Sequence, residues 1–99
     1  LDVISPGAEG AEEVDGNPVF SWVDDSGEDR YHIQVFDTFR ELIWEDPNIP
    51  SSSGSDPEVP YAGPPLDAGM YYQFRVTSFD TNDRPLARTE DLKGVFFLQ

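Results

Sequence analysis

Hydrophobic and polar residues alternate with a period of two along three stretches of the chain, residues 17–23, 30–38 and 70–79. Successive side chains of a β-strand point to opposite faces of a sheet, so this alternation predicts strands with one buried face. The sequence shows no stretch of useful length with the 3.6-residue period of a helix. The side chains that we expect to point inward are Phe20, Trp22, Tyr31, Ile33, Val35, Tyr72, Phe74 and Val76.

Shorter apolar stretches at residues 2–5, 42–44 and 93–98 predict further strands. Clusters of Gly, Pro, Asp and Ser separate the predicted strands and indicate turns, and residues 46–57 are expected to form a Ser/Pro/Gly loop. Six or seven short strands in about 100 residues are typical of a β-sandwich. We therefore predict an all-β fold, an immunoglobulin-like antiparallel β-sandwich of about seven strands.

Three local patterns coincide along the chain, at residues 18–22 (PVFSW), 31–35 (YHIQV) and 66–76 (LDAGMYYQFRV). Together they resemble the second strand, the third strand and the L-x-P-G-x-x-Y-x-x-x-V segment of a fibronectin type III domain. Ala68 stands where that family usually has a proline. The structural positions that the resemblance implies are Trp22, Tyr31, Leu66, Gly69, Tyr72 and Val76.

The resemblance covers residues 17–98 and carries further expectations. Tyr72 matches the tyrosine whose hydroxyl bonds to the backbone a few residues upstream and fixes a corner between strands. Residues 36–45 look like a hairpin whose fourth strand lies beside the third. Such modules in bacteria usually belong to secreted, periplasmic or surface proteins, which implies an extracellular, periplasmic or cell-surface location.

Charge excludes several classes of partner. The 99 residues include 20 acidic and 6 basic side chains, a formal net charge of -14. Such a chain lacks the basic stripe that binds nucleic acid, and an anionic membrane surface would repel it. The sequence has no cysteine and no apolar run long enough for a membrane span, so we expect no disulfide, no thiolate metal site and no membrane insertion.

The acids are unevenly placed along the chain. Residues 1–29 contain nine acids and no base. We expect residues 1–16 to be a loosely held acidic segment with a first strand, and residues 17–99 to form the sandwich. Because the chain begins at Leu1 without a signal segment, we expect it to be part of a longer protein.

Candidate chemistry is sparse. His32 is the only histidine and lies in the middle of a predicted strand, on the opposite face to Tyr31, so we predict a solvated histidine, no catalysis and no cofactor. Two acidic turns offer oxygen ligands for calcium, although neither matches an EF-hand loop and turn preference explains their composition better. Their residues are Asp24, Asp25, Glu28 and Asp29 in the first and Asp80, Asn82 and Asp83 in the second.

A better lead is the outward face of two predicted neighbouring strands. It would carry the mixed side chains His32, Gln34, Phe36, Tyr71, Gln73 and Arg75. Such a mixture suits a protein contact or sugar stacking, while single exposed aromatics are also common for cross-strand pairing alone. We therefore predict a non-catalytic spacer or protein-interaction module of a larger secreted or surface protein, which contacts adjoining domains or another protein. The alternative is a carbohydrate-binding module that binds polysaccharide through Phe36, Trp44 and Tyr71, although Trp44 would equally cap the core.

The last predicted strand is apolar on both faces, at residues 95–98. One face should enter the sandwich. We expect the other face to be exposed on an edge strand, where a neighbouring domain or a second copy would cover it.

Overall fold

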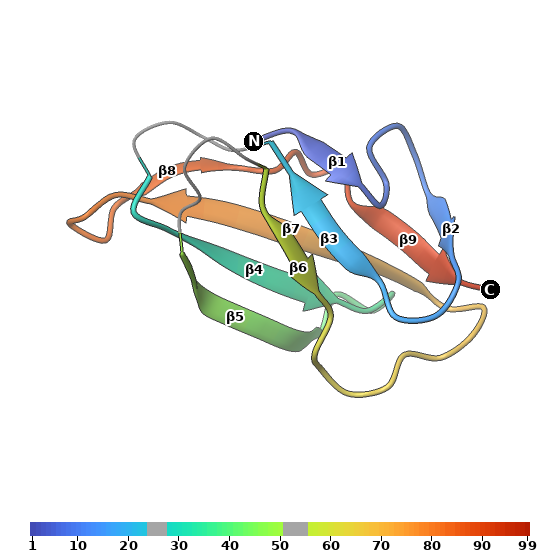
Figure 1. Ribbon diagram of the computed structural model, residues 1–99. Coiled ribbons are helices and arrows are strands. Elements are labelled where there is room, and N and C mark those ends of the chain that lie inside the picture. Colours follow the sequence, from blue (N-terminus) through green and yellow to red (C-terminus); the bar gives the residue numbers. More distant parts are fainter. Residues whose placement is uncertain (24–27, 51–55) are drawn as a thin grey trace.

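The computed structural model describes residues 1–23, 28–50 and 56–99, and within them nine strands form two sheets that pack face to face (Figure 1). The small sheet has the order β1-β3-β6, with bounds Val3–Ser5, Val19–Trp22 and Glu58–Pro60. The large sheet has the order β2-β9-β7-β4-β5, with bounds Glu12–Val14, Val95–Leu98, Tyr71–Phe79, Arg30–Phe36 and Leu42–Pro50. The strand β8 (Pro85–Arg88) also pairs with β7. The predicted all-β, immunoglobulin-like sandwich is confirmed, although the described residues form nine strands in place of about seven and one pair, β2 with β9, is parallel.

Aromatic side chains fill the space between the sheets. All eight side chains that alternation placed inward are buried. Phe20 lies at the centre, where its ring centroid is 4.7 Å from that of Phe74 and 5.6 Å from that of Phe96. Trp22 is fully buried and meets Tyr31 edge to face at 5.3 Å. Each aromatic ring buries roughly 150–250 Å², so these rings supply much of a core that has no disulfide.

The tyrosine corner forms as the resemblance implied. The backbone N–H of Asp67 donates a hydrogen bond of 2.8 Å to the hydroxyl of Tyr72. Leu66 packs against the core just upstream. Gly69 has φ +81°, a left-handed conformation that favours glycine, and its N–H donates to the carbonyl of Leu98. The turn therefore keeps its shape with Ala68 in place of the usual proline.

The hairpin of β4 and β5 is also confirmed, but β5 is longer than expected. It continues through Pro47 to Pro50, so the prediction of a loop over residues 46–57 is wrong for its first part. The strand lies at the edge of the large sheet, where a missing backbone N–H need not break a ladder. Pro60 is the last residue of β6, an edge strand of the small sheet, where a missing backbone N–H is tolerated in the same way. Residues 51–55 lie outside the described part of the chain.

The acidic N-terminal segment belongs to both sheets. The strand β1 pairs with β3, the Ser5–Pro6 peptide bond is cis, and β2 then pairs in parallel with β9. The expected loose attachment of this segment is therefore wrong, whereas the division of the chain at residue 17 stays a prediction. The edge position expected for the last strand is also wrong, because β9 lies between β7 and β2. No apolar alternation marks Glu12 and Glu13 as a strand, so β2 had no signal in the sequence.

The C-terminal strand is split into two parts that pair with the same neighbour. Both β8 and β9 pair antiparallel with β7, at its C-terminal and N-terminal ends respectively. The N–H of Thr89 donates to the carbonyl of Val76, and the carbonyl of Gly94 accepts from the N–H of Phe74. Between these two hydrogen bonds, residues 90–93 do not pair with β7 and form a loop beside it.

Candidate binding face

The antiparallel register of β4 and β7 defines the outer face of the large sheet, the surface that points away from the core. Gln34 lies opposite Arg75, and Phe36 lies opposite Gln73. His32 lies opposite Thr77, six residues along β7 from Tyr71. At about 3.3 Å per residue the two ends of this row are about 20 Å apart. The six predicted residues therefore share one face, but they do not form one site.

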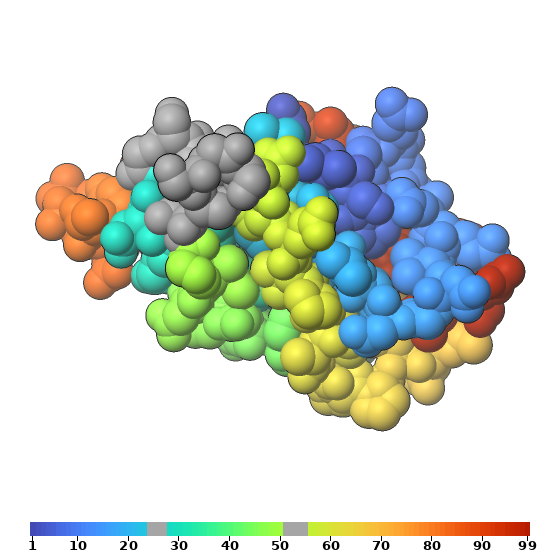
Figure 2. Space-filling view, in the orientation of Figure 1, coloured from blue at the N-terminus to red at the C-terminus, as the bar shows by residue number. Residues whose placement is uncertain are grey.

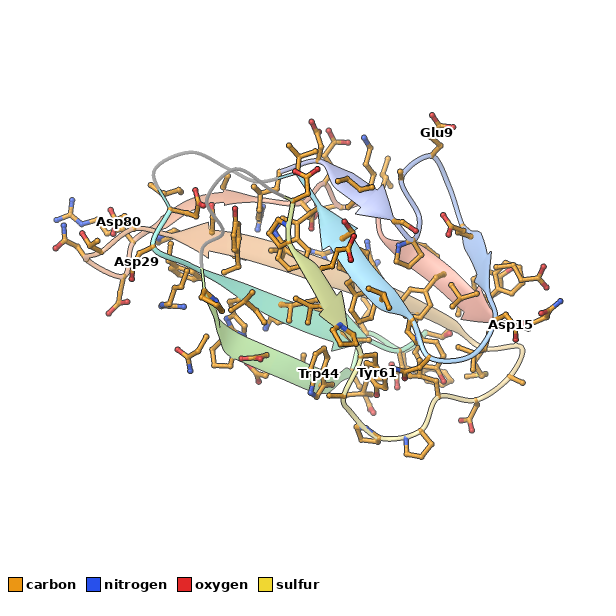
Figure 3. The ribbon with its side chains drawn as sticks, in the orientation of Figure 1. Glu9, Asp15, Asp29, Trp44, Tyr61 and Asp80 are labelled. Atoms are coloured by element: carbon orange, nitrogen blue, oxygen red, sulfur yellow. The ribbon has the colours of Figure 1, made fainter. Side chains whose placement is uncertain are left out.

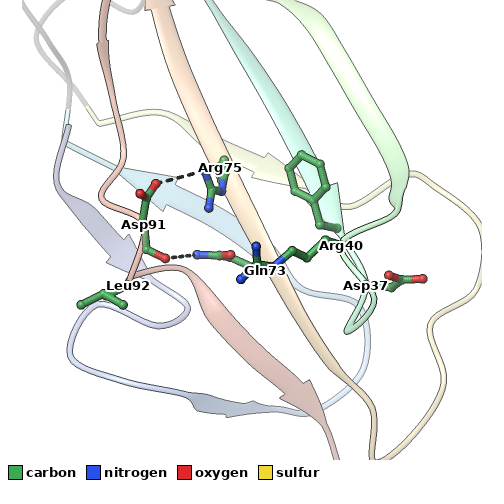
Figure 4. Close-up of a pocket in the computed structure, with 7 residues that line it drawn as sticks. Asp37, Arg40, Gln73, Arg75, Asp91 and Leu92 are labelled. Atoms are coloured by element: carbon green, nitrogen blue, oxygen red, sulfur yellow. Dashed lines mark hydrogen bonds and ion pairs between the residues drawn. The ribbon is translucent and has the colours of Figure 1, made fainter.

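Three of the predicted residues meet in a hollow of about 440 Å³ at one end of the face (Figure 4). Its lining consists of Phe36, Asp37, Arg40, Gln73, Arg75, Asp91 and Leu92. Tyr71 lines an adjoining hollow of about 220 Å³, which shares Asp37, Arg40 and Gln73 with the first. Neither hollow is lined by His32 or Gln34. Sequence reasoning missed the lining residues that come from the β4–β5 turn and from the loop at 90–93, since only the fold brings these segments together.

The predicted polar residues hold the loop in place. Gln73 Nε2 donates to the backbone carbonyls of Asp91 and Lys93, each at 2.8 Å, and Arg75 forms an ion pair of 3.0 Å with the carboxylate of Asp91 (Figure 4). These contacts fix the loop to the sheet, yet its Leu92 side chain is 88% exposed. The loop therefore presents an apolar side chain to solvent beside the hollow.

The other wall of the hollow is the β4–β5 turn. Asp37 Oδ1 accepts hydrogen bonds from the backbone N–H groups of Phe39 and Glu41, at 2.8 and 2.9 Å. Thr38 Oγ1 donates to the carbonyl of Tyr71, which attaches the turn to β7. Phe39, at the tip, is 75% exposed, and Arg40 has φ +64°.

Three predicted residues, His32, Gln34 and Tyr71, do not line this hollow, and His32 and Tyr71 have separate surroundings. His32 Nε2 lies 2.7 Å from Glu45 Oε1 and the ring is partly covered, so the histidine is less solvated than expected. Nearby, the guanidinium of Arg30 lies 4.2 Å from the centroid of the Phe79 ring. Tyr71 packs on Phe97 of β9, with ring centroids 5.1 Å apart.

Trp44 does not belong to the outer face. Its ring meets Tyr61 at 5.2 Å and Phe20 at 6.4 Å, and Trp44 and Tyr61 lie together at the open edge between β5 and the segment after β6 (Figure 3). A Cβ at Gly63 would lie 2.6 Å from the Tyr61 hydroxyl and 2.7 Å from Trp44 Cβ, so this close approach requires glycine. In the space-filling view the segment that carries β6 lies between β5 and β3 (Figure 2). Trp44 therefore caps the core, one of the two interpretations open from the sequence.

Hairpin geometry explains the acidic turn at residues 80–84. Asp80 Oδ1 accepts from the N–H groups of Asn82 and Arg84, at 2.8 and 3.0 Å, and Asp83 forms an ion pair with Arg30. The described residues contain no group of three or more His, Asp or Glu side chains arranged to hold a metal ion. Asp24 and Asp25, named in the other calcium alternative, lie outside the described residues.

Acidic residues are unevenly distributed among the strands: β2, β5 and β6 contain them, whereas β1, β3 and four strands of the large sheet do not. The strands β4, β7, β8 and β9 contain no Asp or Glu, although the chain has 20. Among the described residues, Glu45 of β5 and Asp91 of the loop at 90–93 bring carboxylates to the outer face, where they meet His32 and Arg75. In Figure 3 the labelled acids Glu9, Asp15, Asp29 and Asp80 lie at the periphery of the molecule.

A family model described as Rha78A-like, N-terminal immunoglobulin domain matches residues 11–92. The chain belongs to this family. The match begins in the acidic segment at β2 and continues through β8, so it covers most of both sheets. Comparisons with curated proteins and with solved structures gave no match. Within the described residues no helix is long and apolar enough to cross a membrane.

Proposed function

We propose that this domain is a non-catalytic module that packs against another domain of its parent protein through the outer face of the large sheet. The observation that carries this proposal is that four strands without acidic residues, β4, β7, β8 and β9, lie beside a hollow lined by Phe36, Arg40 and Arg75, in a chain with a net charge of -14. Burying a carboxylate in a contact costs desolvation energy, so an acidic protein makes contacts most readily where it has none. Interface cores are also poor in acids and rich in aromatic residues and Arg.

The family supports the choice of partner. The family is described as an N-terminal domain of Rha78A-like proteins, which supports a partner that follows this domain in the same chain. The chain leaves the sandwich through β9, and Phe97 of β9 contacts Tyr71 on the outer face. A domain that follows β9 directly is therefore tethered beside this face.

The test is a double substitution on the face, Phe36→Ser with Tyr71→Ser, made in the parent protein and in the isolated 99-residue chain. In the isolated chain we expect little change in the melting temperature, because neither side chain is fully buried. In the parent we expect the domain to lose the stabilisation that docking supplies. Ile4→Ser with Val19→Ser is the matched control, since both side chains are exposed on the small sheet. Equal melting of both double variants in the parent would contradict the proposal.

A second candidate function is carbohydrate binding, favoured by the hollow that combines the Phe36 ring with Arg40 and Gln73. Protein sites for sugars pair an aromatic surface with a few placed polar groups. Co-sedimentation with insoluble polysaccharides tests it, with the Phe36→Ser, Tyr71→Ser variant as the control. If the unsubstituted 99-residue chain sediments with the polysaccharide and the variant stays in solution, the result would favour a carbohydrate-binding module over a docking module.

Export of the parent protein is proposed from the fibronectin type III resemblance. Fractionation of the source cells tests it directly. Recovery of the parent protein from the cytoplasm alone would contradict the proposal.

A further inference from the structure

Two hairpins of this domain are closed by the same five-residue turn. In residues 37–41 and in residues 80–84 the turn begins with Asp-Thr, and the Asp Oδ1 accepts from the N–H groups two and four residues later. The N–H of the fourth residue donates to the carbonyl of that Asp in both turns, at 3.0 and 3.1 Å. The fourth residues, Arg40 and Asp83, have φ +64° and +60°.

The two turns differ in the side chains at their third and fourth positions. The turn at 80–84 has Asn82 and Asp83, and Asn and Asp are the non-glycine residues that best tolerate left-handed backbone. The turn at 37–41 has Phe39 and Arg40 at the same positions. Because the backbone and its hydrogen bonds are the same, closing this hairpin does not require Phe39 or Arg40. Their chemistry is available for recognition.

The positive charge of Arg40 has no carboxylate partner within the described residues. Three of the other five basic side chains form ion pairs, which join Arg30 to Asp83, Arg75 to Asp91 and Lys93 to Glu90. Arg84 and Arg88 share the unpaired state of Arg40 within the described residues, but neither lines the hollow. Arg40 extends from the turn toward Gln73 over the floor of the hollow, while Asp37 lies on the other side of the turn (Figure 4). Asp91 already faces Arg75, and Asp37 Oδ1 accepts two backbone hydrogen bonds. The hollow therefore offers a guanidinium to an incoming anion.

We propose that Arg40 binds a carboxylate of the domain that follows in the parent protein, and that Phe39 and Leu92 pack on apolar side chains around that carboxylate. This inference rests on the proposed docking function and names the chemistry of the partner surface. A guanidinium can bind a carboxylate through two parallel hydrogen bonds, which strengthen when the surrounding apolar groups exclude water. Leu92, 88% exposed, lines the hollow, and Phe39, 75% exposed, precedes Arg40 in the turn that forms its wall, so these two side chains would supply that exclusion.

Modification by phenylglyoxal, a reagent specific for guanidinium groups, tests the proposal. The rate at each arginine is followed by mass spectrometry in the isolated chain and in the full parent protein. We expect Arg40 to react at least tenfold more slowly in the parent. Arg84 occupies an exposed position of the other turn and is the internal control, with equal rates in both forms. Hydrogen exchange of residues 71–76 in the same two samples reports whether the outer face is covered.

The outcomes separate this inference from the proposed function. Protection of Arg40 together with residues 71–76 supports both. Protection of residues 71–76 with unchanged Arg40 reactivity overturns the inference and leaves the docking function standing. Unchanged exchange and unchanged Arg40 reactivity overturn both.

A turn exchange gives a second test in the parent protein. The variant Phe39→Asn with Arg40→Asp places the side chains of residues 82 and 83 on the same backbone, so the hairpin should still close. We expect it to abolish the additional protection that residues 71–76 gain in the parent protein relative to the isolated chain, whereas the control Arg84→Asp, with the same change of charge as Arg40→Asp, should leave that gain unchanged. Full protection in the exchanged variant would overturn the inference.

Discussion

At the scale of single residues, the hydroxyl of Tyr72 has a role that its ring does not. It accepts the hydrogen bond from the N–H of Asp67 at the corner before β7, and Tyr72 itself is buried. Tyr72→Phe keeps the ring but leaves this N–H without its acceptor, which should destabilise the domain by about 1–3 kcal/mol. Urea midpoints measure the loss.

Tyr71→Phe is the matched control for this change, because its hydroxyl belongs to a half-exposed ring on the outer face. We expect the free energy of unfolding of the control to lie within about 0.5 kcal/mol of that of the unsubstituted 99-residue chain. Equal midpoints for the two variants would show that the corner hydrogen bond contributes no stability.

The raised pKa of Tyr61 predicts how the stability of the domain responds to alkaline pH. Burial raises its pKa above the ordinary value near 10, with a smaller contribution from Tyr72, and its hydroxyl donates to the carbonyl of Pro64. The folded state thus holds this proton more tightly than the unfolded state. The resulting stabilisation is complete below the unfolded pKa of about 10 and is lost as pH rises through the folded pKa.

The comparison that isolates Tyr61 is the chain with Tyr61→Phe, which cannot ionise at this position. Urea midpoints are measured for both chains between about pH 8 and pH 11. We expect the unmodified chain to lose stability faster than the variant above about pH 10. Parallel losses would contradict the assignment of the raised pKa to Tyr61.

At the scale of elements, two hairpins depend on one carboxylate each. Asp37 and Asp80 each accept two backbone N–H groups that close a turn. Replacing either with Ala should destabilise the domain by about 0.5–2 kcal/mol, as loss of a capping side chain does at a helix end. Thermal or urea unfolding measures each change.

The exposed Glu9→Ala removes one carboxylate elsewhere and controls for the change of net charge. The effects of Asp37→Ala and Asp80→Ala should add in the double variant, because the two turns lie at opposite ends of β7. If Asp37→Ala and Asp80→Ala were as stable as Glu9→Ala, groups other than these two carboxylates would close the turns.

At the scale of the whole molecule, the net charge of -14 should make stability depend on salt. Among the described residues, Arg30–Asp83, Arg75–Asp91 and Lys93–Glu90 form ion pairs with at least one partly exposed partner each, and six bases cannot compensate 20 acids. The Debye length falls from about 30 Å at 0.01 M to about 3 Å at 1 M, which screens the repulsion. Melting temperatures should therefore rise with sodium chloride.

Calcium chloride at matched ionic strength distinguishes screening from a bound ion. A similar rise with both salts is the expected result, because Asp80 already accepts hydrogen bonds within its own turn. A markedly larger rise at millimolar calcium would indicate mass-action stabilisation by a site in an acidic turn. A flat response to both salts would contradict the self-repulsion argument.

The sequence alone determined the fold class, the core and the corner, because each rests on local information. A period of two assigns Phe74 inward and Arg75 outward whatever the neighbours are, and the segment around Tyr72 carries its own turn. Edge strands gave weaker signals, since prolines and glutamates are tolerated where only one side of a strand is paired.

Only the tertiary structure decided which outward residues come together in the hollow. The pairing register of β4 and β7 places Phe36 opposite Gln73. The loop at 90–93 brings Asp91 and Leu92 beside the turn that carries Arg40. Residues in that hollow are up to 56 positions apart in the chain, from Phe36 to Leu92, and no periodicity extends over such separations. The sequence also could not place β2 beside β9, because parallel pairing depends on where two distant segments meet and not on their own alternation.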